Sequence, residues 1–407
     1  MQANEEWRLG VRRGEFVAIM AALVALNALA IDIMLPGLQE IGAALGETDE
    51  NRRQLVITAY FGGFGLGQLV FGPLSDRYGR LVPLFIGIAI YTVTSAFAPL
   101  VTAFDTLLIL RFAQGAGAAS TRALSTAITR DIASGRSMAE IMSLVMTVFM
   151  IMPIIAPAMG QVIMIHGDWH MIFVFMAVAS GLVGLWTWLR IPETLAPDRR
   201  RPFDPRTLVS GAVAVAANRV SFWYSFALTL VFGALFGFIN SAQQIYVGVY
   251  GLGVWFPAAF AGVAIMVSVA SFSNSRLVRR FGTRRVSHAA LVIFAAGAVL
   301  LLSFSLLQVL PLWLFIAIFA LMMTSFGFIG PNMSAIAMEP LGHLAGMAAA
   351  VQGTVQTIGS AVIGAIIGQA FDGSVMPFAA GSAIVALGAL GCVLMAENGR
   401  LSLTGRR

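Results

Sequence analysis

The sequence predicts an all-α membrane protein whose twelve transmembrane helices form two pseudo-symmetric bundles of six. Three observations predict it. Hydrophobic residues make up 58% of the 407 residues and charged residues 11%, at a mean hydropathy of +0.86. The chain contains twelve apolar runs of membrane length, and one long polar gap divides them six and six. A soluble domain carries about 25% charged residues, and each membrane span needs about 20 apolar residues. A protein with one anchor and a large soluble domain is therefore excluded.

The predicted spans follow one another through the chain with short gaps. They are 16–36, 54–74, 82–101, 106–127, 140–163, 170–190, 221–246, 254–274, 287–308, 312–336, 346–370 and 376–396. The proline-broken polar stretch 191–219 is typical of a linker. We therefore expect an N-terminal six-helix bundle at 1–190, a cytoplasmic linker at 191–219 and a C-terminal bundle at 220–407. The first run could pass for a signal peptide, but eleven further runs favour an uncleaved anchor.

The placement of arginine supports this count. All 25 basic residues are arginine. With the N-terminus in the cytoplasm and alternating sides, Arg52 and Arg53 fall outside, Arg111 and Arg122 fall within a span, and the remaining 21 fall inside. Such a bias fits the positive-inside rule, so both termini are predicted to be cytoplasmic. It also accounts for the net charge of +6. The chain has no basic stripe on a polar domain, so we expect no nucleic-acid binding.

A short internal repeat supports two equivalent halves. The loop after the second span and the loop after the eighth align Arg77 with Arg280 and Gly79 with Gly282, both at an offset of 203 positions. That offset is about half the chain. Related halves of this kind usually place a substrate path at the bilayer midplane.

One acid stands out inside a predicted span. Asp32 lies in the first span, and its neighbours one helical turn back, Ala28 and Leu29, are apolar. A buried carboxyl that can change its protonation state suits a proton carrier, although a static ion pair between helices would also place an acid there. Arg111 in the fourth span is the predicted partner. Arg122, about three turns later, either lines the inner part of the same cavity or reaches to the cytoplasmic interface.

Aromatic and uncharged polar side chains gather in the seventh and eleventh spans. This mixture suits a drug-sized amphipathic ligand, although some of these residues must face lipid. With Arg122, the predicted cavity residues are Trp223, Phe236, Asn240, Gln243, Gln244, Tyr246, Gln352 and Gln356.

Prolines and glycines mark bends and close helix contacts. The fifth span contains Pro153, Pro157 and Gly160, and proline removes backbone hydrogen bonds and bends a span. Gly63 and Gly67 form a GxxxG pattern in the second span. Ordinary helix packing explains each of these patterns, and a role in gating is compatible with it.

The sequence shows no sign of a cofactor site, a metal site or an enzyme active site. The single cysteine, Cys392, can form neither an internal disulfide nor a multi-cysteine metal site. His166 and His170 flank Asp168 in an outer loop and lack further ligands. No phosphate-binding P-loop, HExxH or GxSxG motif is present. An ATP-driven pump would need a separate ATPase chain.

Several motifs resemble those of the major facilitator superfamily. The stretch from Gly72 to Arg80, GPLSDRYGR, is similar to the signature of that family between spans 2 and 3. RFAQGAG, which begins at Arg111, resembles its span-4 motif. The stretch from Pro153 to Gly160 resembles the span-5 antiporter motif, with Ala156 and Gln161 where glycines are expected.

Other residues resemble the Bcr/CflA branch of drug/proton antiporters. They are Asp32 in the first span, Arg130-Asp131 and Glu339-Pro340. Members of this branch export chloramphenicol, florfenicol and bicyclomycin. The resemblance implies that Asp32 is the proton-coupling acid and Arg111 its cationic partner.

The resemblance also implies a conformational latch at the cytoplasmic side, formed by Gly72, Asp76, Arg77, Gly79 and Arg80. The second-half copy has Arg279 where the acid should stand, so a symmetric latch is not expected.

The predicted function is therefore proton-coupled antiport of small amphipathic drugs, amphenicol- or bicyclomycin-like, across the bacterial inner membrane by alternating access. The proton gradient supplies the energy, and no cofactor is needed. The alternative is a proton-coupled exporter of one metabolite, such as an amino acid or nucleoside. A receptor would need long soluble signalling segments, which the sequence lacks. The expected partners are the small-molecule substrate, protons and the lipid bilayer, and the chain is expected to work as a monomer.

Overall fold

The computed structural model describes residues 10–200 and 205–402, except for the side chains of 136, 205–208 and 342–346. The chain divides into two compact units. Unit 1 comprises Met1–Thr48 and Ala59–Asp204, and unit 2 comprises Asp49–Thr58 and Pro205–Arg407. The short stretch Asp49–Thr58 thus packs with the C-terminal residues, although it precedes most of unit 1 in the sequence.

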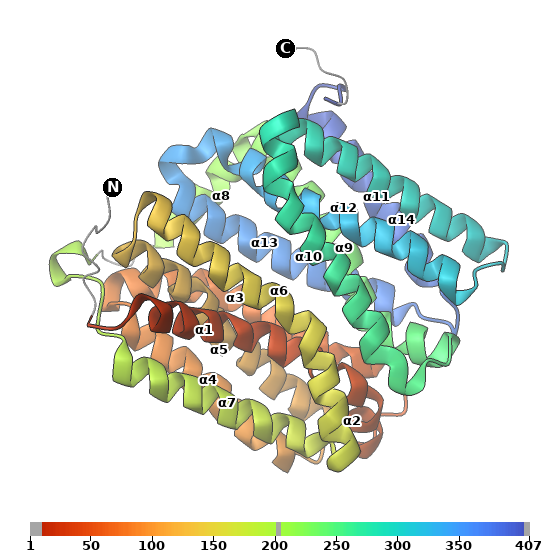
Figure 1. Ribbon diagram of the computed structural model, residues 1–407, viewed down its shortest axis with the longest axis horizontal. Coiled ribbons are helices and arrows are strands. Elements are labelled where there is room, and N and C mark those ends of the chain that lie inside the picture. The colour runs from red at the N-terminus through yellow and green to blue at the C-terminus, as the bar shows by residue number, and fades with distance from the viewer. Residues whose placement is uncertain (1–9, 201–204, 403–407) are drawn as a thin grey trace. The chain divides into compact units, whose positions relative to one another are not determined.

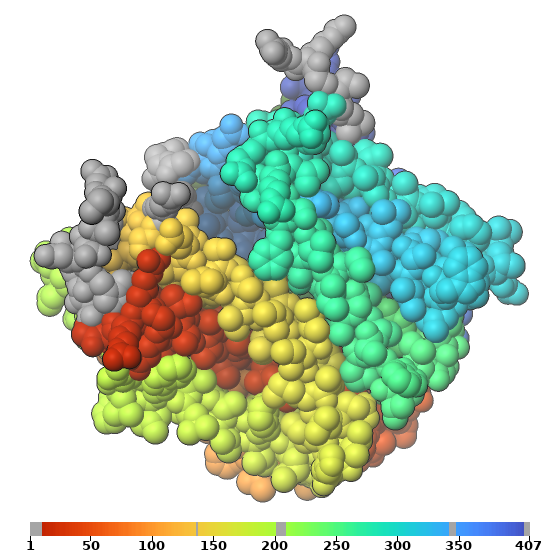
Figure 2. All heavy atoms as spheres, in the orientation of Figure 1, coloured from red at the N-terminus to blue at the C-terminus, as the bar shows by residue number. Residues whose placement is uncertain are grey.

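The described part of unit 1 is built from long helices and one short helix (Figure 1). They are α1 (Arg13–Asp32), the short α2 (Leu38–Ala44), α3 (Leu55–Tyr78), α4 (Leu81–Phe97), α5 (Phe104–Ile132), α6 (Gly135–His166) and α7 (Trp169–Arg190). The first turn of α3 belongs to unit 2 and the rest to unit 1. Figure 2 shows α1 in red beside α6 in yellow on the near face of this unit.

Within its described residues, unit 2 contains six long helices and one shorter one. They are α8 (Pro205–Ala217), α9 (Arg219–Gln243), α10 (Phe256–Phe281), α11 (Thr283–Leu306), α12 (Leu312–Met338), α13 (Ala345–Gln369) and α14 (Met376–Ala396). A π-helical turn, Gln244–Val249, continues α9. The helix α8 occupies part of the predicted linker and packs on α13.

Eleven helical segments among the described residues are long and apolar enough to cross a membrane. The remaining long helix is α5, which has 29 residues and would span about 43 Å at 1.5 Å per residue. It contains Arg111 and Arg122, whose charges lower its hydropathy. The predicted all-α membrane fold is confirmed.

The end of α1 is set by a proline. Pro36 has no N–H to donate to the carbonyl four residues back, which is that of Asp32. α1 accordingly ends at Asp32, and a 3₁₀ turn, Leu35–Gly37, leads into α2. Asp32 therefore occupies the last turn of a helix, where backbone carbonyls lack partners within the helix.

Glycines set the closest helix contacts in unit 1. A Cβ atom on Gly63 would collide with the carbonyl of Phe112, and one on Gly115 would collide with the carbonyl of Tyr60. Gly67 packs against Ala116 in the same way. In lipid, helices associate through such close packing and through hydrogen bonds rather than by hydrophobic burial. The GxxxG pattern thus joins α3 to α5 with the two backbones in contact.

In unit 2, α9 and α13 run parallel. Gly359 packs on Thr229, Gly364 on Phe236, and Gly368 on Asn240, so residue numbers rise together along both helices. Beside them lies an aromatic core in which the Phe238 ring centroid is 4.3 Å from that of Phe319 and 5.9 Å from that of Tyr246.

Candidate functional site

Asp32 is buried, with 5% of its surface exposed. Within the described part of the chain, its carboxyl group makes no hydrogen bond or ion pair. Because an unpaired charge is costly to bury, such a position favours the neutral form of the acid unless a cation or water approaches it. Asp32 thus lies in the last turn of α1, inside the bundle, whereas the predicted first span continued to position 36.

Arg111 is fully buried, and its guanidinium is tied to α1 rather than to the Asp32 carboxyl. Nη2 donates to the carbonyl oxygen of Ala30 at 2.9 Å, and Nη1 donates to Oε1 of Gln114. The guanidinium also lies 4.7 Å from the ring centroid of Tyr60. A cation at the C-terminal turn of a helix satisfies free carbonyls and complements the helix dipole. Arg111 therefore holds the turn that contains Asp32.

Further hydrogen bonds between polar side chains join α1 to α5 and α5 to α4. The Asn27 amide donates to the hydroxyl of Thr121 at 2.9 Å, while its own Oδ1 is buried without a partner. Gln114 Nε2 donates to Ser95 Oγ on α4 at 2.6 Å. The hydroxyl of Tyr60 is also buried and unpartnered. Gln114 and Tyr60 thus place uncharged polar groups beside Arg111, and the Asn27–Thr121 bond lies farther along α5.

The antiporter-motif glycine reaches the same place from α6. A Cβ atom on Gly160 would collide with the carbonyl oxygen of Ile33, the residue after Asp32. α6 therefore contacts the end of α1 backbone to backbone. Pro153 and Pro157 both lie inside α6, at the positions predicted to bend it.

The predicted cavity residues occupy different surroundings. Arg122 is exposed on unit 1, with its guanidinium 5.3 Å from the ring centroid of Phe149. Trp223 is half-buried beside Phe222. Phe236 and Tyr246 are buried, and Tyr246 lies within the aromatic core of unit 2.

The polar members of the set lie at two separate levels of unit 2. Asn240 adjoins Gly368: a Cβ atom added to Gly368 would lie 3.1 Å from the Cβ atom of Asn240. Gln352 lies sixteen positions earlier on α13, which corresponds to about 24 Å along a helix. Gln352 is buried with Nε2 unpartnered, and Gln356 is half-buried. One drug-sized ligand cannot contact Asn240 and Gln352 together.

The level of Asn240 contains an amide network centred on the stretch Asp49–Thr58. Gln54 Nε2 donates to Gln244 Oε1, and Gln244 Nε2 donates to Asn51 Oδ1 at 2.8 Å. Asn51 Nδ2 in turn donates to the carbonyls of Gln369 and Phe371 at 3.1 and 2.8 Å. Gln243 Oε1 and Asn240 Oδ1 are buried nearby without partners. The side-chain bonds of this network join uncharged amides, and the backbone N–H of Asn51 donates to Asp49 Oδ1 at 2.9 Å.

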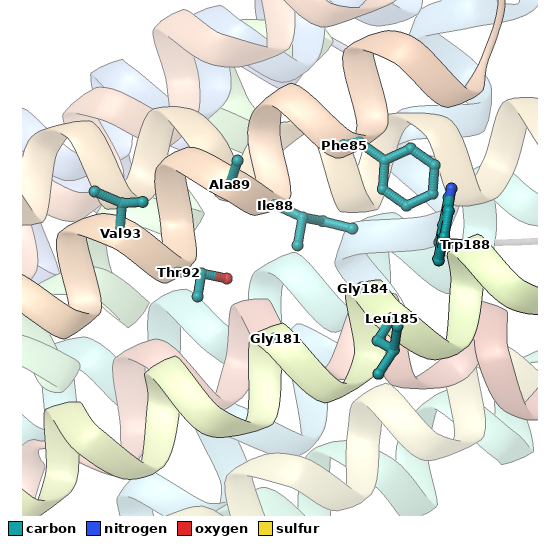
Figure 3. A pocket seen from close by; sticks show the side chains of 9 residues that line it. All are labelled: Phe85, Ile88, Ala89, Thr92, Val93, Gly181, Gly184, Leu185 and Trp188. Carbon is teal, nitrogen blue, oxygen red and sulfur yellow. The ribbon is translucent and has the colours of Figure 1, made fainter.

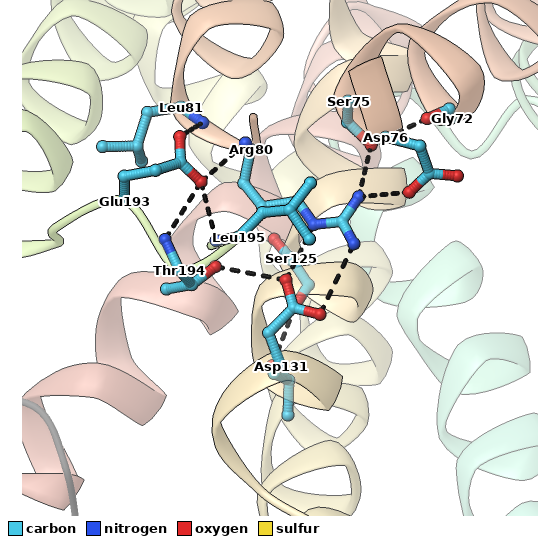
Figure 4. Close-up of polar contacts among 11 residues, drawn as sticks. Gly72, Ser75, Asp76, Arg80, Leu81, Ser125, Asp131, Glu193, Thr194 and Leu195 are labelled. Carbon is cyan, nitrogen blue, oxygen red and sulfur yellow. Dashed lines mark hydrogen bonds and ion pairs between the residues drawn. The ribbon is translucent and has the colours of Figure 1, made fainter. Parts of the chain in front are cut away.

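The predicted latch is centred on Arg80 (Figure 4). Nη1 donates to Asp76 Oδ1 at 2.6 Å and to Ser75 Oγ at 2.9 Å, and Nε donates to Asp131 Oδ2 at 2.7 Å. Burial acts to lower the pKa of Arg80, but the carboxylates of Asp131 and Asp76 outweigh it and raise that pKa. Arg80 thus joins the end of α3 to the end of α5.

Glu193 completes the latch from the chain after α7. Its carboxylate accepts backbone N–H bonds from Arg80, Leu81, Thr194 and Leu195 at 2.9–3.1 Å. Partial burial acts to raise the pKa of Glu193, but these N–H bonds outweigh it and hold the pKa below its ordinary value.

The remaining predicted latch residues differ in their roles. Gly79 has φ +93°, and a Cβ atom there would lie 2.6 Å from Glu193 Oε2, so glycine is required twice over. The carbonyl of Gly72 accepts a bond from Ser75 at 2.7 Å. Arg77 is exposed and lies against Tyr78, outside the Arg80 network.

Unit 2 has a partial counterpart of this latch, which the sequence did not lead us to expect. Arg284 pairs with Glu339 at 2.9 Å and with Glu397 at 3.0 Å. Arg284 follows Arg80, and Glu397 follows Glu193, by the same 204 positions. Arg279 stands where the Asp76 equivalent would be, so the acids come only from the ends of α12 and α14.

A shallow groove of about 430 Å³ lies on unit 1 between α4 and α7 (Figure 3). It is lined by apolar side chains and by Thr92, whose hydroxyl pairs with that of Ser180 at 2.8 Å. No predicted site residue lines it. Apart from the indole N–H of Trp188, its lining offers few polar groups to an amphipathic ligand.

Sequence reasoning missed three parts of these arrangements. Asp131 was noted only for its resemblance and was given no role, although an acid next to a helix end was a usable signal for Asp131 and for Glu193. Asn51 and Gln54 carried no sequence signal, because their partners lie about 190 and 320 positions away. The network around Tyr224 and His288 was also unforeseen.

Comparison with known proteins agrees with this architecture. Residues 17–365 match a family model described as Major Facilitator Superfamily. A bicyclomycin resistance protein homolog of Haemophilus influenzae is 29% identical over 86% of this chain and 88% of its own. A chloramphenicol resistance protein of Pseudomonas aeruginosa is 28% identical over 90% of this chain and 84% of its own. A bacterial homolog of the human lysosomal transporter Spinster has a similar fold, with a TM-score of 0.74, 14% identity and coverage of 98% and 100%.

Proposed function

Because the chain belongs to the major facilitator superfamily, we propose that it exports small amphipathic drugs, amphenicol- or bicyclomycin-like, in exchange for protons. The observation that carries this proposal is the buried Asp32 carboxyl, which has no partner among the described residues, two positions from the carbonyl that holds Arg111. The resistance names of relatives at 28–29% identity support the substrate class.

The proposed cycle uses the contacts of Arg111. With Asp32 neutral, Arg111 bonds to Ala30 and Gln114, as in this structure. When Asp32 loses its proton, the guanidinium exchanges the Ala30 carbonyl for the nearby carboxylate, because a charge-assisted bond is the stronger one. That exchange moves the last turn of α1, against which α6 packs at Gly160. Proton release is thereby coupled to a helix movement. Each inward proton supplies about 2.3 kcal/mol per 100 mV of membrane potential.

Uncharged polar groups are proposed to contact the substrate. Asn27 in unit 1 and Gln243 and Gln352 in unit 2 each keep a buried donor or acceptor atom without a partner. A neutral drug with hydroxyl and amide groups could satisfy such atoms without burying another charge. The levels of Asn240 and Gln352 on their helices differ by about 24 Å. We therefore propose that they act on the substrate at different stages of its passage.

The test is efflux from a pump-deficient bacterium challenged with amphenicols, bicyclomycin and lipophilic dyes. The variants are Asp32→Asn, Arg111→Ala and, as a matched control, Asp105→Asn, an exposed acid on α5. Expression of each is checked by blotting. We expect a protonophore to stop export by the wild-type protein, Asp32→Asn to abolish uphill export, and Asp105→Asn to leave it intact. Uphill export by Asp32→Asn would refute the proton role. Export of none of these compounds would favour the metabolite exporter.

A further inference from the structure

His288 on α11 is fully buried, and both of its ring nitrogens are bonded. Nε2 lies 2.7 Å from the hydroxyl of Tyr224 on α9. Nδ1 accepts the backbone N–H of Ser402 at 3.0 Å. A single imidazole thus joins α11, α9 and the segment after α14.

The partners determine the protonation state of the ring. A backbone N–H can only donate, so Nδ1 must carry a lone pair. The hydroxyl of Tyr224 donates to Glu397 Oε1 at 2.8 Å, and Arg284 pairs with the same carboxylate at 3.0 Å. The single hydroxyl hydrogen is therefore used, and the Tyr224 oxygen accepts from Nε2–H. His288 is neutral here, in the Nε2–H form.

We propose that His288 is a proton-binding site, and that a proton taken up at Nδ1 releases the segment after α14 at Ser402. Once Nδ1 carries a hydrogen, the Ser402 N–H faces another donor, and the bond between them is lost. Histidine is the side chain whose ordinary pKa lies within the pH range that cells experience. No bond other than the Nδ1–H bond forms.

Charged groups from each neighbouring element act on this proton. Glu397, after α14, favours it through Tyr224. Arg284, one turn earlier on α11, opposes it, while Glu339 offsets part of the Arg284 charge. Arg285 on α11 and Arg400 in the terminal segment are the other nearby cations in sequence. The site depends on neither the substrate nor Asp32, so it can stand if the transport proposal fails.

The composition of the chain makes a direct test possible. It contains four histidines, His166, His170, His288 and His343. Replacing the other three by glutamine leaves a full-length protein with one histidine, which is labelled with ¹⁵N and followed by NMR in detergent. We expect a neutral Nε2–H ring at pH ~8 and a doubly protonated ring at pH ~5. A ring that keeps one form throughout would overturn the proposal.

A second readout follows the mobility of the segment at Ser402. Ser402→Cys retains the backbone N–H, and Cys392→Ala removes the only native thiol. A nitroxide at position 402 should become about twofold or more mobile on acidification, with the midpoint of the His288 titration. His288→Gln should abolish this pH dependence, and His166→Gln, an exposed control, should retain it. If the His288→Gln label remains pH-dependent, or if the ring titrates without any change at position 402, the proposed release is wrong.

Should His288→Gln fold poorly, Tyr224→Phe provides the second variant. It keeps the ring and the Ser402 bond but removes the hydroxyl link to Glu397. The pH midpoint of the mobility change at position 402 should then move. A midpoint identical to that of the wild-type protein would show that the link to Glu397 has no effect on the site.

Discussion

At the scale of single residues, Gly160 determines how closely α6 can approach the proton site. An added methyl group would meet the carbonyl of Ile33 and must separate α6 from α1. We expect Gly160→Ala to lower uphill export and to destabilise the folded protein by about 1–3 kcal/mol, the usual cost of overpacking. Thermal unfolding in detergent and drug efflux measure the two effects. Gly391→Ala on α14 is the control, because nothing lies within 4 Å of its added Cβ atom. Equal behaviour of the two variants would contradict the α6–α1 contact.

Glu193 makes a second residue-scale prediction, one that concerns pH. Its folded-state pKa lies below the ordinary 4.5, because four backbone N–H groups stabilise the carboxylate. Its stabilising contribution is therefore complete above pH 4.5 and is lost as the pH falls through the folded-state value. Thermal unfolding of the wild-type protein should weaken below pH ~4.5, and Glu193→Gln should weaken less over that range while starting lower at pH ~7. An unchanged pH profile in Glu193→Gln would show that these bonds contribute nothing to stability.

At the scale of the element, α3 belongs to both units. Asn51 and Gln54, just before this helix, are bonded to the end of α13 and to Gln244 after α9. In its first turn, the Thr58 hydroxyl accepts a bond from Asn240 of α9. Two positions later, the ring of Tyr60 lies on Arg111. Any movement of this turn is transmitted along a continuous helix to the group that holds α1. α3 therefore links the amide network to the proposed proton site by covalent structure alone.

Gln54 tests this link. Gln54→Ala leaves the buried Gln244 carbonyl oxygen without its donor, at a cost of about 1–3 kcal/mol. Local opening of the turn should become about tenfold or more faster in hydrogen exchange of peptides that cover 49–58. Gln161→Ala, a half-buried amide on α6, is the control and should leave those peptides unchanged. Unaltered exchange in Gln54→Ala would mean that the amide network does not hold α3.

At the scale of the whole molecule, composition and periodicity predicted the fold class and the helix order, since length and hydropathy are local properties. α5 could be recognised because Arg111 and Arg122 interrupt an otherwise apolar run. The membership of 49–58 in unit 2 could not be predicted, because it depends on partners far away in sequence. For the same reason the sequence paired Arg111 with Asp32, whereas the Ala30 carbonyl receives its bond in this structure. Which face of a helix meets which neighbour is decided by packing.

The orientation in the membrane follows from charge and is open to direct measurement. With 21 of 25 arginines on one side, both termini should be cytoplasmic. In a Cys392→Ala background, Glu50→Cys lies in a predicted outer loop and Asp198→Cys in the predicted inner linker, and both positions are exposed. A membrane-impermeant maleimide should label position 50 in intact cells and position 198 only after permeabilisation. The reverse pattern would invert the topology. Labelling of both positions in intact cells would mean that an even number of crossings separates them instead of the predicted odd number, and the arginine bias would then need another cause.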